Sequence, residues 1–181
     1  MPALYTRFRD VPQFTDAGHY QVNIAFDYLE EHLTRWNEGN LLDLSPDYQR
    51  CHVWTEKQQR AYIEYVLRGG HASRDIWFNC SSWMKGFDTP IELVDGKQRL
   101  EAMRKFLRSE LSVFGGAYKK DFTDKMRMIR CDFLFHMNDL KTRAEVIQWY
   151  IDMNTGGVVH SLAEINKARK LLERAKHLTP L

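Results

Sequence analysis

The feature that most constrains this chain is a change of hydrophobic period at residues 91–107. Residues 91–94 form a short apolar run typical of a buried strand. After residues 95–99, which read Asp-Gly-Lys-Gln-Arg, the apolar residues recur at helical spacing. The pattern therefore predicts a strand-to-helix junction at residues 95–99. Backbone N–H groups at the start of a helix lack intrahelical partners, so such a junction favours an anion.

The rest of the chain alternates between helix-like and strand-like patterns. Helices are predicted over residues 22–36, 56–68, 142–153 and 162–172, and strands over residues 41–44, 75–80, 91–94 and 129–135. Thr55 is the predicted N-cap of the second helix. We therefore expect an α/β (α+β) fold, with a small mixed sheet, surrounding helices and a C-terminal helical part over residues 141–176.

Length and composition are those of a single unit. The chain has 181 residues, of which 44% are hydrophobic and 13% aromatic. This is ample for one buried core and leaves no room for a second large domain. We expect one domain over residues 1–181, with its core over residues 18–172 and disorder only at the ends.

Cysteine usage and hydropathy indicate the compartment. Cys51, Cys80 and Cys131 are far apart and show no paired spacing, which argues against a disulfide framework and against a zinc ribbon. No apolar stretch approaches the roughly 18 residues of a membrane span, and the first residues contain no apolar signal-peptide core. We therefore expect reduced thiols, a cytoplasmic location and no membrane partner.

The distribution of charge is more informative than the net charge, which is only +2. Residues 97–130 contain ten lysines and arginines against four acids, whereas residues 22–47 contain six acids against one arginine. The basic segment predicts a surface that attracts nucleic-acid phosphates. Residues 167–176 add five positive charges against one glutamate. For this last stretch a solvated helix face remains the alternative.

The side chains of residues 95–99 suit phosphate chemistry. Gly96 allows the backbone to approach a ligand closely, and the planar guanidinium of Arg99 can bind two phosphate oxygens. Asp95 can hold Mg²⁺ or accept a proton. The alternative is a strand-to-helix turn in which a surface salt bridge joins the charged residues. The composition of the segment leaves both interpretations open.

Two further polar segments are candidates for the same site. Tyr48, Gln49 and Arg50 precede Trp54 and the predicted N-cap. Their alternative is a surface loop with one aromatic residue anchored in the core. Asn154 precedes two glycines between the last two predicted helices. Helix punctuation explains the glycines and the capping-box spacing after them, but it does not explain Asn154.

Together the three segments resemble the N-terminal domain of GmrSD-type modification-dependent restriction enzymes, a family with a DGQQR motif. Residues 46–54 resemble the family's P-x-Y-Q-R-x-x-x-W segment, and residues 95–100 resemble DGQQR-L, with Lys97 in place of the first glutamine. The family's asparagine-glycine segment is matched by Asn154, Gly157, Ser161 and Glu164. Order and spacing agree over residues 18–172.

The resemblance implies a ParB/sulfiredoxin-like fold, with binding and hydrolysis of an NTP coupled to action on DNA. Carried over to this sequence, it implies catalytic roles for Asp95, Gln98 and Arg99, and a Mg²⁺ ligand in Asp95. The nucleotide-binding residues that it implies are Gln49, Arg50, Gly96, Lys97, Arg99 and Asn154. The added positive charge of Lys97 suits phosphate.

The predicted function is therefore that of an NTP-binding and NTP-hydrolysing protein that acts on or recognises DNA in a phage or defence context, with nicking as one outcome. The family's His-Asn-His-like nuclease half is not in this sequence, so double-strand cutting would need a partner nuclease. One alternative is a non-enzymatic nucleotide- or DNA-binding module that signals to such a nuclease. Another is a ParB-fold kinase that transfers phosphate to a hydroxyl. A P-loop is not expected, because no Walker-type segment occurs.

Overall fold

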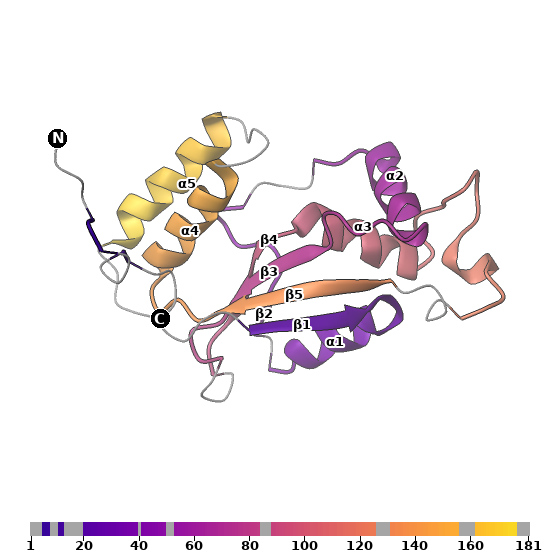
Figure 1. The fold of residues 1–181 in the computed structure, drawn as a ribbon, viewed down its shortest axis with the longest axis horizontal. Coiled ribbons are helices and arrows are strands. Elements are labelled where there is room, and N and C mark those ends of the chain that lie inside the picture. The colour runs from indigo at the N-terminus through magenta and orange to yellow at the C-terminus, as the bar shows by residue number, and fades with distance from the viewer. Residues whose placement is uncertain are drawn as a thin grey trace.

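The computed structural model of the chain describes residues 5–7, 11–12, 20–39, 41–49, 53–83, 88–125, 131–155 and 162–176 (Figure 1). For Thr155 and residues 162–165 only the backbone is described. Within these ranges no helix combines the length and the apolar character needed to cross a membrane.

A five-stranded mixed sheet forms the centre of the fold, with strand order β1-β5-β3-β4-β2. The strands are β1 (Tyr20–Ala25), β2 (Leu42–Asp43), β3 (Asp75–Asn79), β4 (Ile91–Asp95) and β5 (Asp132–Asn138). β1 pairs antiparallel with β5 and β3 antiparallel with β4, whereas β3 and β5, like β2 and β4, are parallel. With helices around it, this sheet confirms the predicted α+β class.

Helices surround the sheet, and four of them pack against each other in two pairs. They are α1 (Leu29–Trp36), α2 (Glu56–Leu67), α3 (Lys97–Leu107), α4 (Arg143–Thr155) and α5 (Leu162–Ala175), with short 3-10 turns at η2 (Phe26–Tyr28) and η3 (Lys119–Asp121). α2 packs on α3, and α4 packs on α5. Figure 1 shows the α4–α5 pair at one end of the molecule and the α2–α3 pair toward the other. As predicted, α2 begins after Thr55, which forms a capping box with Gln58.

The prediction of one helix over residues 22–36 is wrong in its first half. Residues 20–25 form strand β1, a 3-10 turn follows, and the α-helix begins only at Leu29. Every residue of β1 pairs with β5, from Tyr20 opposite Met137 to Ala25 opposite Asp132. The apolar residues of this segment fit a helical period, but pairing with a distant strand decides the outcome.

The last predicted strand, over residues 129–135, is observed three residues later as β5. Its final residues pair with β3, where Met137 lies opposite Phe78 and Asn138 opposite Asn79. Residues 129 and 130 lie outside the described residues. The pairing with β3 therefore extends the strand past the end that its own apolar pattern indicated.

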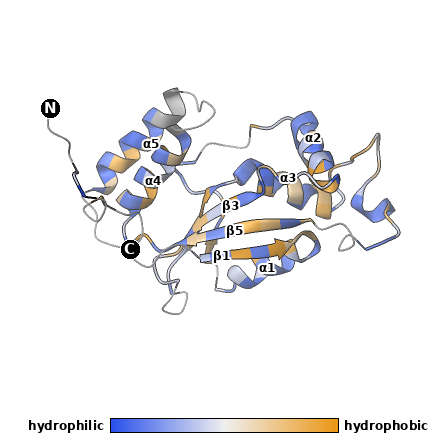
Figure 2. Ribbon diagram, in the orientation of Figure 1, coloured by the Kyte–Doolittle hydropathy of each residue, from blue (hydrophilic) through white to orange (hydrophobic). Residues whose placement is uncertain are grey.

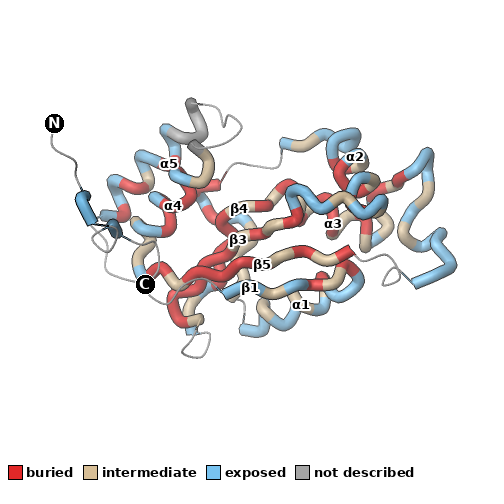
Figure 3. The backbone as a smooth tube through the Cα atoms, viewed as in Figure 1, coloured by how far each residue is buried: buried red, intermediate tan, exposed pale blue. Residues whose placement is uncertain are grey.

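The two faces of the sheet are buried in two hydrophobic clusters. Ile76 and Leu93 belong to the cluster that includes residues of α1, α2 and α3, whereas Val94 packs with residues of α4 and α5. Adjacent residues of a strand point to opposite faces, so β4 is buried on both sides. Figure 3 shows the buried residues concentrated along the strands, and Figure 2 shows hydrophobic residues on β1 and β5.

Gly96 joins β4 to α3 in a conformation that other residues rarely adopt. Its φ angle is +100°, in the left-handed region. A Cβ atom at this position would lie 2.6 Å from Cδ1 of Ile76 and 3.3 Å from its Cα atom. The turn and the packing of the neighbouring strand therefore both require glycine. The predicted strand-to-helix junction is confirmed.

Replacing Gly96 by alanine should lower the free energy of unfolding by about 2–4 kcal/mol, because a left-handed alanine costs roughly 1–2 kcal/mol and overpacking against Ile76 adds a similar amount. Gly115→Ala is the matched control, since Gly115 has a φ of +86° but no atom within 4 Å of an added Cβ. Gly115→Ala should lose only the stability that a left-handed alanine costs. Urea unfolding of both variants measures the difference in the free energy of unfolding. Equal losses would show that the Ile76 side chain can move aside without an energetic cost.

Candidate functional site

A cavity of about 670 Å³ lies at the junction of β4 and α3. Its lining brings together predicted site residues from three segments that are distant in sequence, namely Gln49, Asp95, Gly96, Lys97, Gln98, Arg99 and Asn154. Trp54, Tyr62 and Tyr150 add aromatic walls. Arg50, predicted as a nucleotide ligand, lies outside the described residues, as do Gly157, Ser161 and the side chain of Glu164.

Two buried glutamines, which we call the crossed glutamines, join the first two of these segments. Nε2 of Gln49 donates hydrogen bonds to the main-chain carbonyls of residues 93 and 94 in β4, the second at 2.8 Å. In the opposite direction, Oε1 of Gln98 in α3 accepts from the N–H groups of residues 53 and 54, at 2.9 and 3.0 Å. Gln49 thus binds the strand that leads into α3, and Gln98 of α3 binds the backbone four and five residues after Gln49.

The amide oxygen of Gln49 is buried and has no hydrogen-bond partner among the described residues. The orientation of the amide is fixed, because only its NH₂ group can donate to two carbonyls. A buried acceptor without a partner typically costs about 1–3 kcal/mol. Since Gln49 lines the cavity, this oxygen is a candidate acceptor for a donor group of a ligand.

Asp95 and Arg99 form an ion pair across the first turn of α3, with Oδ2 of Asp95 2.5 Å from Nη2 of Arg99. Their side chains retain 35% and 19% of their accessible surface, so both remain in reach of a ligand in the cavity. The predicted metal ligand and the predicted phosphate ligand are thus bonded to each other. The salt bridge that the alternative interpretation expected is present at the strand-to-helix turn.

The first turn of α3 lines the cavity with residues 96–99. Gly96 is its N-cap, and no side-chain cap hydrogen bond is formed there within the described structure. The first N–H groups of a helix have no intrahelical acceptors, and this end of the helix dipole is positive. The cavity wall therefore combines main-chain donors with the ammonium group of Lys97, an arrangement suited to an anion.

Aromatic residues line the cavity beside these charged groups. The ring centroids of Trp54 and Tyr62 are 5.3 Å apart, and the ring planes are inclined at 63°. The hydroxyl of Tyr62 donates a hydrogen bond to the carbonyl of Ser73 at 2.8 Å. Burial raises the pKa of Tyr62 well above its ordinary value, although the nearby guanidinium of Arg99 opposes the shift. The phenol therefore stays protonated at neutral pH and keeps its donor.

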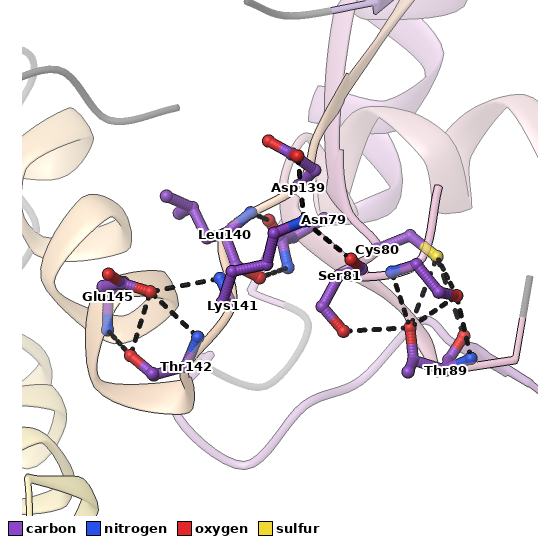
Figure 4. A network of polar contacts seen from close by, with 10 residues as sticks. Asn79, Cys80, Ser81, Thr89, Asp139, Leu140, Lys141, Thr142 and Glu145 are labelled. Carbon is purple, nitrogen blue, oxygen red and sulfur yellow. Dashed lines mark hydrogen bonds and ion pairs between the residues drawn. The ribbon is translucent and has the colours of Figure 1, made fainter. Parts of the chain in front are cut away.

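Hydrogen bonds at the end of β5 position α4, the helix that contributes Asn154 (Figure 4). The side chain of Asn79 accepts from the N–H of Leu140 at 2.9 Å and donates to its carbonyl at 3.2 Å. Thr142 and Glu145 then form a capping box at the start of the helix. Near its end, Nδ2 of Asn154 donates to the carbonyl one turn earlier at 2.6 Å. The side chain is therefore held against α4 at the cavity wall.

Glu92, a buried acid in β4, was missed by the sequence prediction. Its carboxylate accepts hydrogen bonds from the hydroxyl of Tyr48 at 3.4 Å and from Nη1 of Arg143 at 3.1 Å. Arg143 also pairs with Asp47. Burial raises the pKa of Glu92 although Arg143 opposes the shift. The signal was an acid inside an otherwise apolar strand run, and the resulting bonds fix residues 47–48 against α4.

A comparison with protein-family models matches residues 30–134 to the GmrSD restriction endonuclease, N-terminal domain. The matched span is more than half of the chain and includes both segments that the crossed glutamines join. The chain belongs to the GmrSD N-terminal domain family. The resemblance expected from the sequence is thereby confirmed. Searches of curated proteins and of solved structures gave no match.

In this GmrSD N-terminal domain the candidate site extends beyond the family match, because Asn154 lies after residue 134. The described residues contain no group of three or more histidine, cysteine, aspartate or glutamate side chains that could hold a metal ion. Asp95 is the carboxylate among the described residues of the cavity lining. The arrangement therefore suits binding of an anion at a helix start, with one carboxylate beside it.

Gln98→Leu should lower the free energy of unfolding by about 1–3 kcal/mol, because the N–H groups of residues 53 and 54 lose their acceptor. Gln148→Leu is the control, since Gln148 makes an exposed hydrogen bond on α4 and should change stability by less than about 0.5 kcal/mol. Urea unfolding gives both values. Amide hydrogen exchange at residues 53 and 54 should accelerate in Gln98→Leu alone, and unchanged exchange would contradict the role of the crossed glutamines.

Proposed function

We propose that this GmrSD N-terminal domain binds an NTP in the cavity at the β4–α3 junction, hydrolyses it, and couples the reaction to action on DNA or recognition of DNA. The observation that carries the proposal is the meeting of an uncapped helix start, Lys97 and Arg99 with aromatic walls in one cavity. Phosphates require donors and positive charge, and a base favours an aromatic surface. The restriction-endonuclease family supports the link to DNA.

The cavity fits a nucleotide in size and in chemistry. Its volume of about 670 Å³ lies within the roughly 300–1,000 Å³ of small-molecule sites. Lys97, Arg99 and the first N–H groups of α3 would hold the phosphates, and Trp54 would contact the base. Gly96 would contribute by shaping the turn at the start of α3, because the space of its missing side chain is occupied by Ile76.

Asp95 would hold the Mg²⁺ that accompanies the nucleotide. Mg²⁺ is commonly bound by one or two carboxylates together with phosphate oxygens, rather than by a complete set of protein ligands. A cavity whose described lining has one carboxylate fits this mode of binding. When bound, the ion would neutralise charge on the phosphoryl oxygens.

Arg99 must exchange its partner for this site to work. Its guanidinium is bonded to Asp95, and binding of phosphate would draw it away and release the carboxylate. Gln98 would act as a positioning residue, because its amide oxygen holds the backbone of residues 53 and 54 and thereby the ring of Trp54. Asn154 would contribute from α4, where its side chain is held at the cavity wall.

Surface charge supports the DNA half of the proposal. Within the basic segment 97–130, Arg99 pairs with Asp95, while Arg104 and Arg108 both pair with Glu30. Within the described part of this segment, the basic side chains outside ion pairs are Lys97, Lys105, Lys119, Lys120 and Lys125. Lysines outside ion pairs can displace counterions from a nucleic acid, which makes binding dependent on salt.

A second candidate function is a nucleotide switch that signals to a partner nuclease without hydrolysis. The closed ion pair of Asp95 and Arg99 favours it, because binding that opens this pair changes the start of α3 without any chemistry. Turnover assays with each NTP, with and without DNA and Mg²⁺, separate the two candidates. Binding without turnover would select the switch.

Arg99→Lys should bind NTP more weakly by about 2 kcal/mol, which is roughly 30-fold. Lysine keeps the charge but loses the planar fork that binds two phosphate oxygens. Calorimetric titration measures the affinity, and turnover is assayed alongside. Arg108→Lys, just after the end of α3, is the control and should behave like the wild type. Unchanged affinity and turnover in Arg99→Lys would show that the site is purely structural.

Asp95→Asn should affect NTP binding differently with and without Mg²⁺. In EDTA the affinity should rise, by up to about 1 kcal/mol, because Arg99 is no longer held by a carboxylate. With Mg²⁺ this advantage should shrink and turnover should fall, because the proposed metal ligand is lost. Titrations under both conditions give the comparison. Weaker binding in EDTA would contradict a competition between Asp95 and phosphate for Arg99.

A further inference from the structure

A second cavity, of about 530 Å³, borders the start of α3. It is lined by residues 44–47, by α3 and by Lys167 of α5. Gln49 and Lys97 line both cavities, so these two side chains separate the second cavity from the proposed NTP site. The remainder of the second cavity has no part in the function proposed above.

The lining of the second cavity has a large apolar part. Its apolar residues are Leu44, Pro46, Leu93 and Leu100. All but Leu44 are buried, and Leu44 is half-buried. Leu93 and Leu100 are only 0% and 2% exposed, so a ligand would meet Leu44 and the aliphatic parts of the charged side chains in the lining. Such a surface can take the flat face of a base, which every nucleotide presents irrespective of its identity.

The charges of this cavity leave two ammonium groups available. Asp47 pairs with an arginine of α4, and Arg104 pairs with a glutamate of α1 at 2.8 Å. Lys97 and Lys167 take part in no ion pair within the described residues. Against them stands one remaining carboxylate, that of Glu101. The cavity thus combines an apolar surface with a net positive charge, which suits a base that carries a phosphate.

Basic residues continue from the second cavity along α5. Lys167, Lys170 and Arg174 are exposed and follow one another at spacings that place them on one side of the helix. Arg169 is also exposed but lies on the opposite flank of the buried face. A row of cations that leads away from a cavity fits a polymer with repeated phosphates better than it fits a free nucleotide.

We infer that the second cavity holds one nucleotide unit of a single-stranded nucleic acid. The base lies on Leu44 and the aliphatic parts of the lining, its phosphate contacts Lys97 and Lys167, and the following phosphates run along α5. The base must be unstacked to enter, which excludes an intact duplex. The inference rests on the proposed function in one respect: Lys97 would contact phosphates of both ligands, so the NTP and the nucleic acid would meet at one side chain.

Binding of a fluorescent oligothymidylate about a dozen residues long tests this inference, by anisotropy at about 50 mM salt, where phosphate contacts are strong. Lys167→Gln should weaken binding by about tenfold and reduce the salt slope by about one. Arg169→Gln removes the same charge from the opposite flank and should bind like the wild type. Ser45→Trp fills the cavity from an exposed position and should abolish oligonucleotide binding while NTP affinity stays unchanged.

Equal losses in Lys167→Gln and Arg169→Gln would overturn the inference, because α5 would then be a solvated basic helix. A second equivalent of NTP that displaces the oligonucleotide would also overturn it, in favour of a free-nucleotide site. So would a wild type that binds NTP but no oligonucleotide. If NTP fails to bind and oligonucleotide binding still depends on Lys167, the inference stands and the proposed NTP site is rejected.

Discussion

The crossed glutamines are the interaction on which the arrangement of the site depends. The described residues between β2 and α2, 44–49 and 53–55, form no helix or strand, and their backbone groups need partners wherever they are buried. Gln98 supplies an acceptor for residues 53 and 54, directly before the N-cap of α2. Gln49 anchors the earlier part of the same segment on β4. Gln98 therefore fixes the start of α2 and the ring of Trp54, and Gln49 fixes one side of the boundary between the two cavities.

β4 transmits this constraint to the rest of the molecule because it is buried on both faces. Leu93 packs with the cluster of α1, α2 and α3, and Val94 packs with the α4–α5 pair. Glu92 on the same strand holds Tyr48 and Arg143, so a polar connection runs from the strand to α4. Both cavities lie where these groups meet, and neither can be formed by one group of helices alone.

The parts of the fold that local patterns determine could be predicted from the sequence. The junction at Gly96 needs only a strand run, a glycine and a helical period, and the N-cap of α2 at Thr55 is equally local. β1 was missed because its state depends on a strand far along the chain. The second cavity was missed because residues 44–47, α3 and α5 meet only through tertiary packing.

For the site, the sequence predicted which residues meet, because three motif segments each contribute to the first cavity. The salt bridge between Asp95 and Arg99 was one of two interpretations that the sequence left open, and the choice between them depends on side-chain geometry that only the structure shows. The roles of Asp95, Gln98 and Arg99 stay predictions, as do the single domain over residues 1–181 and the ParB/sulfiredoxin-like assignment. Arg50 lies outside the described residues.

The contact between position 96 and Ile76 has a consequence for how relatives of this chain should be compared. Because the neighbouring strand leaves no space for a side chain there, selection for folding alone would keep this glycine, even in a descendant that had lost every ligand. An intact glycine in a relative is therefore poor evidence that its site still works. Packing does not require the charged ends of Lys97 and Arg99. Substitutions at those two positions would therefore be the earliest evidence that a relative has lost the function of the site.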